Sequence, residues 1–442
     1  MIAVTKRYFV RTFGCQMNEH DSERISGLLE AEGYERAATA SDADLVLLNT
    51  CAIRENADNK LYGALGALKP AKDANPDLRI AVGGCLVQKD KGLVIEKAPW
   101  VDVAFGTFAV GELPALLRER ERTGATAFEF REQTEVFPSA LPARRDHPFH
   151  AWVSVSVGCD NACTFCIVPL VRGKQVSRRM GEILDEVRAL AGEGVLEVTL
   201  LGQNVNTYGR DLDGRPLFAE LLRALDDVEG LRRVRFTSPH PHDFTPDVID
   251  AMASSSVVCE HIHFPLQSGS DRVLSRMRRS YRSGRYLAWL DAIREAIPAV
   301  AVSTDVIVGF PGETDDDFAQ TLRVVEQAQF DSAYTFQYST RPGTDAAGYD
   351  EQVPPAVVAE RFGRLVEAQE RISLAKNAAL IGAHFEVLVE GPSKKDPAVL
   401  TTRTRTNKIA HIRGAAAPGT FLTARITGAH PHFLDAAAPA LV

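Results

Sequence analysis

Cysteine is scarce in this chain, with seven residues among 442. No apolar run approaches the roughly 18 residues of a membrane-spanning helix, so an integral membrane protein is not expected. The N-terminal stretch MIAVTKRYFVRTFG also lacks the apolar segment and cleavage site of a secretory signal peptide. We therefore expect a cytoplasmic protein, in which clustered cysteines bind metals or do chemistry rather than form disulfides.

Positive charge is not in excess either. The chain has 50 Lys and Arg against 58 Asp and Glu, which gives a net charge of −8. The protein as a whole thus has no electrostatic preference for nucleic acid, and RNA binding would need local basic patches. Apolar content of 45% and charged content of 24% are ordinary for globular proteins, and the length suggests about three domains.

The first part of the chain alternates apolar segments with helical patterns. The segments YFVRTFG, DLVLLNT and RIAVGG are predicted strands, and Ile25, Leu28 and Leu29 recur at helical spacing between the first two. Continuous apolar strands separated by helices predict a parallel sheet covered on both faces. We assign residues 5–122 to a Rossmann-like parallel α/β domain. Charges and prolines then replace the periodicity, which predicts a linker over 123–144.

Each of these three strands ends at a cysteine, namely Cys15, Cys51 and Cys85. The carboxyl ends of parallel strands lie along one edge of a sheet, where ligands bind in α/β domains. The three side chains can therefore converge on one site although they are far apart in sequence. The alternative is three unrelated buried thiols, because cysteine often serves as a small core residue.

Strand–helix alternation resumes after the linker, with longer units. The predicted strands are WVSVSV, LEVTLL, RVRFTS, EHIHFP, STDVIVGF and SAYTFQY. Such units predict a βα barrel, complete or partial, over residues 145–375. Short alternating strands with turn residues follow, and they predict a small β-barrel over 376–442, a type that often binds nucleic acid.

The stretch GCDNACTFC, with Cys159, Cys163 and Cys166, follows the first strand of the predicted βα barrel. Its loop lies at the carboxyl end of that barrel, where active sites are built. Structural zinc sites and cubane iron–sulfur clusters both take four protein ligands, whereas this loop offers three. Three thiolates on a four-iron cluster leave one iron open to a small ligand. The alternative is a zinc knuckle completed by His147 or His150.

A C-x3-C-x2-C loop in a βα barrel resembles the radical S-adenosylmethionine (SAM) enzymes. Within that superfamily the chain resembles the methylthiotransferases, through the ordered stretches FGCQMNEHDSE, LNTCAIRENA, GGC, GCDNACTFCIVP, RGKQVSRR, LLGQNVN, PLQSGSD and DVIVGFPGETDDDF. GCQMNEHDSE and LLGQNVN are more similar to the tRNA-modifying branch than to the branch that modifies a ribosomal protein. The resemblance covers nearly the whole chain. Local departures are PLVRG, where PYTRG is expected, and TSPH, where TSHP is expected.

This resemblance implies SAM and two 4Fe–4S clusters as cofactors. The three cysteines of the barrel loop would bind the cluster whose open iron chelates SAM, and one electron would cleave SAM to a 5′-deoxyadenosyl radical. The radical would take hydrogen from C2 of N6-isopentenyladenosine at position 37 of tRNA. The three strand-end cysteines would bind the second cluster, whose open iron carries the sulfur that is methylated by a second SAM and delivered to C2.

The same resemblance implies the tRNA anticodon stem-loop as substrate, reduced flavodoxin or ferredoxin as electron donor, and a TRAM-like C-terminal barrel that grips RNA. The sulfur donor is left open, and a monomer without membrane association is expected. Candidate RNA contacts are Arg403, Arg405, Lys408 and Arg413 on the predicted barrel. Charge runs also occur on solvated faces without any ligand, which is the alternative interpretation.

Candidate SAM contacts follow the ends of later predicted strands, where glycine permits close backbone approach to a ligand. They are Gly202, Gln203, Gln267, Ser268, Gly309, Pro311, Gly312 and Glu313. The alternative for the last four is a turn before a helix, since Thr314 and Asp317 are spaced as a capping box. The remaining cysteine, Cys259, is expected in the core.

Two rival functions stay open. One is a sibling methylthiotransferase that acts on threonylcarbamoyl-adenosine tRNA or on a ribosomal protein. The other is a non-catalytic RNA-binding protein that uses metal only for folding.

Overall fold

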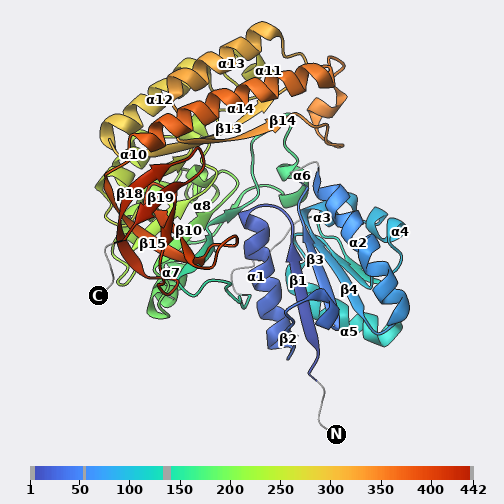
Figure 1. Ribbon diagram of the computed structural model, residues 1–442. Helices are drawn as coiled ribbons and strands as arrows, with labels where there is room; N and C mark the ends of the chain where they lie inside the picture. The colour runs from blue at the N-terminus through green and yellow to red at the C-terminus, as the bar shows by residue number, and fades with distance from the viewer. Residues whose placement is uncertain (1–4, 53–55, 133–140, 439–442) are drawn as a thin grey trace. The chain divides into compact units, whose positions relative to one another are not determined.

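The computed structural model describes residues 5–52, 56–132 and 141–438 (Figure 1). The chain forms two compact units. One contains the residues up to Asp146 with Ser156–Ala162 and Cys166–Val176, and the other contains His147–Val155, Cys163–Phe165 and the residues from Ser177 onward. Every helix in the described ranges is too short or too polar to cross a bilayer.

A parallel sheet of six strands forms the centre of the first unit. Its order is β2 (Glu35–Arg36), β1 (Arg7–Thr12), β3 (Leu45–Thr50), β4 (Arg79–Gly84), β5 (Val103–Phe105) and β6 (Ala127–Glu129). Strand β3 is buried along its whole length. A strand covered on both faces has no polar side, which explains its continuous apolar sequence and confirms the predicted parallel α/β domain.

Helices cover both faces of this sheet (Figure 1). On one face lie α1 (Gln16–Ala31) and α5 (Leu113–Thr123), where Ile25 and Leu116 pack in the cluster that contains Leu47 of β3. On the other face lie α2 (Asn56–Ala74), α3 (Cys85–Asp90) and α4 (Leu93–Lys97), where Leu61 packs in the cluster that contains Val46. Alternate residues of β3 thus serve two separate cores.

Part of the predicted linker completes the first unit. Strand β6 lies within residues 123–144 and pairs with β5 as the edge of the sheet. Leu141 packs against the core under α1, and a Cβ on Gly27 of α1 would lie 2.4 Å from the Pro142 carbonyl oxygen. The structure differs here from the predicted linker because a three-residue edge strand is too short to show alternation. Residues 133–140 of that linker lie outside the described ranges.

The second unit contains the predicted six-stranded βα repeat, and its two sheets form a partial barrel. One sheet has the order β7 (His150–Ser154), β10 (Glu197–Leu201), β11 (Arg233–Phe236), and the other β12 (His261–His263), β13 (Ala301–Val308), β14 (Ser332–Gln337). A parallel bridge between Val234 and Val258 joins them. Among the described strands β7 and β14 do not pair, so the barrel is open at that seam.

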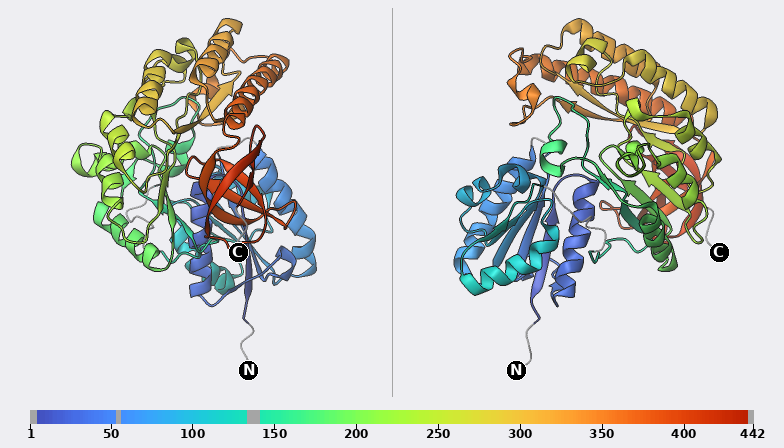
Figure 2. Two further views of the ribbon diagram at one scale, coloured as in Figure 1. Left: turned by 60° about the vertical axis from the view of Figure 1, so that its left-hand side comes forward. Right: turned by 180° about the vertical axis from the view of Figure 1, so that it is seen from behind.

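Helices pack against the outer side of the partial barrel, and α12, α13 and α14 lie along β13 and β14 (Figures 1 and 2). Val153, Leu200, Ile262 and Val302 contribute to that core, so the residues that alternate with them face the interior. The helices are α7 (Met180–Gly192), α9 (Phe218–Leu225), α10 (Pro246–Ser254), α12 (Ser283–Ala296), α13 (Asp315–Ala328) and α14 (Pro355–Ala378), with the short α8 (Arg210–Asp213) and α11 (Asp271–Arg276) between them.

The predicted capping box begins α13. The Thr314 hydroxyl accepts the backbone N–H of Asp317 at 3.3 Å, and the Asp317 carboxylate accepts the N–H of Thr314 at 2.8 Å. The same carboxylate accepts the hydroxyl of Ser270, the N-cap of α11, at 2.6 Å. One aspartate therefore caps α13 and ties it to the start of α11.

The last strands form the predicted small barrel, which is closed. Its order is β15 (His384–Pro392), β16 (Val399–Thr404), β17 (Ile409–Arg413), β19 (Leu434–Ala437) and β18 (Phe421–Ala429), drawn in red in Figure 2. Val387, Leu400, Ile412 and Ala424 fill its interior. Closure leaves no unpaired strand edge on this small domain.

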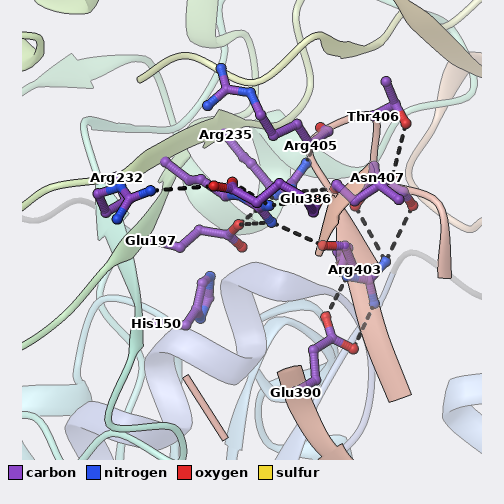
Figure 3. Close-up of polar contacts among 12 residues, drawn as sticks. His150, Glu197, Arg232, Arg235, Glu386, Glu390, Arg403, Arg405, Thr406 and Asn407 are labelled. Atoms are coloured by element: carbon purple, nitrogen blue, oxygen red, sulfur yellow. Dashed lines mark hydrogen bonds and ion pairs between the residues drawn. The ribbon is translucent and has the colours of Figure 1, made fainter. Parts of the chain in front are cut away.

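A buried arginine attaches the closed barrel to β11 of the partial barrel (Figure 3). The Arg235 guanidinium donates to the carbonyl oxygens of Arg405 at 3.0 Å and Thr404 at 2.9 Å. Its Nε lies 3.1 Å from the carboxylate of Glu197, which is also buried. Arg235 therefore binds two backbone groups of the closed barrel and neutralises a buried carboxylate of the partial barrel.

Replacing Arg235 by methionine should destabilise the second unit by about 3 kcal/mol, because Glu197 loses its nearest cation while it stays buried. Urea unfolding followed by circular dichroism measures the change. The control is Arg413→Met, which removes an exposed arginine of the closed barrel and should change stability by less than about 0.5 kcal/mol. Equal unfolding midpoints for the two variants would contradict this role of Arg235.

Candidate functional site

The strand-end cysteines lie on three neighbouring strands of the first unit. Cys15 follows β1 and caps α1, Cys51 follows β3, and Cys85 is the first residue of α3 after β4. Strands β1, β3 and β4 are adjacent and parallel, so all three thiols stand at the carboxyl edge of the sheet. The Cys51 thiol is hydrogen-bonded to the sulfur of Cys15.

Two glycines let the backbone approach closely beside these thiols. Gly14 has φ +132°, and a Cβ there would lie 2.4 Å from the Cβ of Cys51. Gly84 has φ +98°, and a Cβ there would lie 2.4 Å from the carbonyl oxygen of Thr50. Both positions combine left-handed backbone with the absence of space, so only glycine fits without displacing the neighbouring strand end.

Two buried amide side chains, Asn18 and Asn49, stabilise the backbone beside the strand-end cysteines. Asn18 of α1 donates to the carbonyl oxygen of Thr50 at 2.9 Å, and Asn49 of β3 donates to the carbonyl oxygen of Asn18 at 2.9 Å. Asn49 also donates to the hydroxyl of Ser22 at 2.9 Å. These bonds fix the start of α1, where Cys15 stands, against the end of β3, where Cys51 stands.

The electrostatic surroundings differ between the thiols. The hydrogen bond from Cys51, the charge of Arg172 and backbone N–H groups at the start of α1 outweigh burial and lower the pKa of Cys15 to about 6. Burial raises the pKa of Cys85, against the opposing charge of Arg172. Arg172 itself is buried and donates to the Asp21 carboxylate at 2.6 Å. The edge thus contains a thiol that ionises readily and a buried cation.

Thiols are the ligand type that iron–sulfur clusters take, and three of them stand at this edge. Across the ranges that the structure describes, no three His, Cys, Asp or Glu side chains are grouped to hold a single metal ion. The candidate zinc ligand His150 begins β7 and lies 3.0 Å from Thr199, at the strand end opposite the cysteine loop.

The cysteine loop after β7 is divided between the units, with Cys159 and Cys166 in the first and Cys163 in the second. In the first unit the loop is anchored by the N–H of Cys159, which donates to the Gly173 carbonyl at 3.1 Å. Gly158 has φ +77°, and a Cβ there would lie 2.0 Å from the Lys174 carbonyl oxygen. The loop backbone therefore packs directly on the segment that follows Cys166.

In the second unit a buried arginine binds Cys163. Arg279 donates to the Cys163 sulfur at 3.4 Å and to the hydroxyl of Tyr281 at 3.1 Å. That hydroxyl in turn donates to the carbonyl of Leu266, just beyond β12, at 2.9 Å. Arg279 is buried although it stands in an arginine-rich stretch, and nothing in the local sequence pattern shows that burial.

Among the predicted SAM contacts, Gln203 has a side-chain amide that is buried without partners among the described residues. It follows β10 directly after the buried Gly202, and both atoms of its amide are buried without a hydrogen-bond partner in the described part of the chain. Buried amides are nearly always hydrogen-bonded in native proteins. The Gln203 amide therefore fits a polar ligand bound at the carboxyl end of the partial barrel.

Gln267 and Ser268 are engaged with neighbouring elements. Gln267 has φ +66°, and its backbone pairs with β13 through a bond from its N–H to the Asp305 carbonyl at 2.8 Å. The Ser268 hydroxyl is fully buried and lies 3.3 Å from the hydroxyl of Thr321 on α13. Ser268 is thus buried against α13.

Glu313 is also used inside the protein. Its carboxylate accepts the N–H of Gly309 at 3.0 Å and the Arg361 guanidinium at 2.8 Å. A Cβ on Gly309 would lie 2.5 Å from Val358 of α14, so this glycine is required by packing against that helix. The side chain of Glu313 therefore shapes the turn after β13.

Pro311 and Gly312 bind α11 and the segment that precedes α14, respectively. The Pro311 carbonyl accepts from Arg276 at 3.2 Å, and the Gly312 N–H donates to the Glu351 carbonyl at 2.6 Å. Gly312 has φ +80°, which is left-handed backbone. The turn is thus held by hydrogen bonds to α11 and to the segment before α14.

The inner face of the second sheet carries residues that sequence reasoning missed. Tyr334 and Phe336 of β14 are 55% and 37% exposed. Beside them the His263 ring lies 5.7 Å from the Tyr334 ring, and its Nε2 lies 3.4 Å from the Asp305 carboxylate. The alternation of β14 was visible in the sequence, but it does not tell which side of the strand faces the barrel interior.

Two of the predicted RNA contacts instead join the closed barrel to the partial barrel. The Arg405 guanidinium donates to both oxygens of Glu260, at 2.8 Å and 2.9 Å. Lys408 donates to Asp331 at 2.8 Å and to Asn377 of α14 at 2.9 Å. Both cations are engaged with acceptors of their own unit.

The other two pair with acids of the closed barrel. Arg403 of β16 binds Glu390 of β15, at 3.1 Å for the longer contact (Figure 3). Arg413 lies 3.3 Å from Asp396, and its side chain is 75% exposed. Of the predicted RNA contacts, Arg413 is therefore the most accessible. The remaining cysteine, Cys259, is buried as expected.

Three family profiles match the chain in succession. Residues 7–106 match the uncharacterized protein family UPF0004, residues 153–325 match the radical SAM superfamily, and residues 378–438 match the TRAM domain. These segments contain the three strand-end cysteines, most strands of the partial barrel with its cysteine loop, and the strands of the closed barrel.

Solved structures share the fold at low sequence identity. The radical SAM methyltransferase TsrM from Kitasatospora setae aligns with a TM-score of 0.56 and 13% identity, covering 78% of this chain and 75% of that one. The cobalamin-dependent SAM radical enzyme OxsB aligns with a TM-score of 0.51 and 13% identity, covering 83% and 61%. Both show fold similarity alone.

Curated relatives are similar over almost the full chain. A tRNA-2-methylthio-N(6)-dimethylallyladenosine synthase from Thermobifida fusca is 57% identical over 98% of this chain and 89% of its own length. The synthase of that name from Acidothermus cellulolyticus is 58% identical, over 98% and 88%, and that from Rhodococcus jostii is 56% identical, over 99% and 89%. The chain belongs to the tRNA-2-methylthio-N(6)-dimethylallyladenosine synthase family of radical SAM proteins.

Proposed function

We propose that this protein transfers a methylthio group to C2 of N6-isopentenyladenosine at position 37 of tRNA. The observation that carries the proposal is the convergence of three cysteines at the carboxyl edge of the first sheet, in a chain that also has a radical SAM cysteine loop. Family membership supports the substrate, since the relatives are named for that product. Bound SAM and a reduced cluster supply the radical chemistry that side chains cannot perform.

Each cysteine triad would hold one 4Fe–4S cluster. Cys159, Cys163 and Cys166 would bind the cluster that takes SAM, and the strand-end triad would bind the cluster that carries the transferred sulfur. Three thiolates per cluster leave one iron for a small ligand, as both tasks require. The lowered pKa of Cys15 supports this assignment, because metals bind the thiolate form.

The chain's own residues would orient SAM and the base. The unpartnered amide of Gln203 offers hydrogen bonds to SAM, and the turn around Gly309 holds the backbone in place beside it. The exposed rings of Tyr334 and Phe336 offer stacking surfaces for the adenine and its apolar substituent. His263 and Asp305 form a polar pair next to these rings.

We propose that the protein binds the anticodon stem-loop of tRNA and that the closed barrel contributes to this binding. A soluble flavodoxin or ferredoxin would supply electrons, and the protein would act as a cytoplasmic monomer. Because Arg405 and Lys408 are engaged with acids of their own unit, Arg413 is the strongest remaining phosphate contact in the predicted basic cluster.

The first prediction concerns the reaction itself. The protein, reconstituted anaerobically with iron and sulfide, should methylthiolate isopentenyladenosine-containing tRNA in the presence of SAM and a reductant. Mass spectrometry of the digested tRNA detects the added group. Cys163→Ala and Cys51→Ala should each abolish the product, but SAM cleavage to 5′-deoxyadenosine should survive in Cys51→Ala because the SAM cluster remains.

The rival functions give different results in that assay. SAM cleavage without modification of this tRNA, together with activity on threonylcarbamoyl-adenosine tRNA or a ribosomal protein, would assign the chain to a sibling reaction. A colourless preparation that contains zinc, lacks sulfide and leaves SAM intact would identify a non-catalytic RNA-binding protein.

The second prediction concerns the base. Tyr334→Ala should raise the KM for tRNA about tenfold, because loss of one stacking ring costs about 1–3 kcal/mol. SAM cleavage without tRNA should be unchanged. Leu374→Ala, which shortens an exposed side chain on the outer helix α14, is the control and should leave the KM as it is. An unchanged KM in Tyr334→Ala would remove this residue from the base site.

The third prediction concerns RNA affinity. Arg413→Ala should reduce the slope of log affinity for tRNA against log salt by about 1, because one phosphate contact is lost. Binding is measured by fluorescence anisotropy at several salt concentrations. Arg405→Ala should instead lower the thermal midpoint of the second unit, since Glu260 loses its cation. An unchanged salt slope in Arg413→Ala would show that this arginine does not touch RNA.

A further inference from the structure

Arg172 is a buried cation beside the strand-end cysteines. It ends helix α6 (Val168–Arg172), which follows the cysteine loop, and its side chain is 7% exposed. The guanidinium donates to Asp21 of α1 at 2.6 Å and to the sulfur of Cys85. Its charge also acts on Cys15. A single guanidinium therefore binds one carboxylate and one thiol of the triad, and its charge acts on a second thiol.

The rest of α6 packs against residues beside the strand-end cysteines. Ile167 and Val171 are buried in one apolar cluster with Ala52 and Cys85. The Val171 carbonyl accepts the hydroxyl of Thr107, from the loop after β5, at 2.5 Å. The residues directly after Cys166 are thus fixed on the edge of the sheet by apolar contacts, one hydrogen bond from a side chain to the backbone, and one ion pair.

Charge explains why a cation is needed here. Thiolates gathered at a buried edge repel one another, and Asp21 adds a further negative charge close by. An anionic centre in a low-dielectric interior is stable only when a cation or hydrogen-bond donors compensate it. Hydrogen bonds to ligand sulfurs and nearby positive charge also make a cluster easier to reduce.

We propose that Arg172 is a positioning residue for the cluster of the first unit: it orients Cys85, offsets the thiolate charge and ties the chain after Cys166 to that site. This inference rests on the proposed function, since it assumes that the strand-end triad holds a cluster. It assigns α6 a specific task, namely to fix the last cysteine of the SAM loop relative to Cys85 through six residues of packed chain.

The test uses the full-length chain with Cys159, Cys163 and Cys166 replaced by alanine, so that only the strand-end triad remains to bind a cluster. After anaerobic reconstitution, iron and sulfide content, the electron paramagnetic resonance spectrum and the reduction potential are measured. Arg172→Gln should make the potential more negative and speed iron loss to a chelator. Asp21→Asn should make the potential more positive, because a negative charge is removed.

Two further variants separate charge from folding. Arg172→Lys keeps the positive charge but loses the guanidinium that donates to both Asp21 and Cys85. The reduction potential of this variant should therefore stay nearer that of the parent, while its electron paramagnetic resonance spectrum changes. The matched control is Arg120→Gln, which breaks a buried pair with Asp102 at the opposite edge of the same sheet. The reduction potential and the spectrum of that control should be the same as those of the parent.

The outcomes distinguish this inference from the function on which it rests. If the alanine background binds no iron and sulfide, the two-cluster function fails and the inference falls with it. If the background binds a cluster but Arg172→Gln keeps the parent's potential and chelator resistance, the function stands and the role of Arg172 is refuted. A shift in Arg172→Gln equal to that in Arg120→Gln would also refute it.

Discussion

Parallel strand pairing is the constraint on which the candidate sites depend. Because the strands of each sheet run the same way, residues that end successive strands are carried to one edge, however far apart they are in sequence. Cys15, Cys51 and Cys85 meet in this way in the first unit. In the second unit the same rule places Gln203 and the end of β12 on the side where the cysteine loop begins.

Buried arginines accompany the thiols in both units. Arg172 binds Cys85 in the first unit, and Arg279 binds Cys163 in the second. Each arginine has a second fixed partner, Asp21 or Tyr281, which holds the guanidinium in one orientation. A rigid donor next to a ligand sulfur sets both the direction of the thiolate and the charge around it, and surrounding groups of this kind tune metal centres.

Basic residues of the closed barrel stabilise the fold by pairing with acidic residues. Arg405 and Lys408 look like phosphate contacts in the sequence, yet each is paired with an acid of the partial barrel, Glu260 or Asp331. Arg235 adds backbone hydrogen bonds at the same junction. Ionic and backbone contacts thus attach the closed barrel to the partial barrel.

The sequence by itself determined the alternation of strands and helices, the cysteines at strand ends, the C-x3-C-x2-C loop and the capping box of α13, because each depends on spacing within a short segment. Only the tertiary structure decided which charged side chains are buried and which groups they pair with. Asp21 and Arg172 are 151 residues apart, and Glu260 and Arg405 are 145 apart. It also decided that Tyr334 faces the barrel interior. Partners of this kind come from distant strands and helices, and local periodicity contains no information about which distant element will lie opposite a side chain.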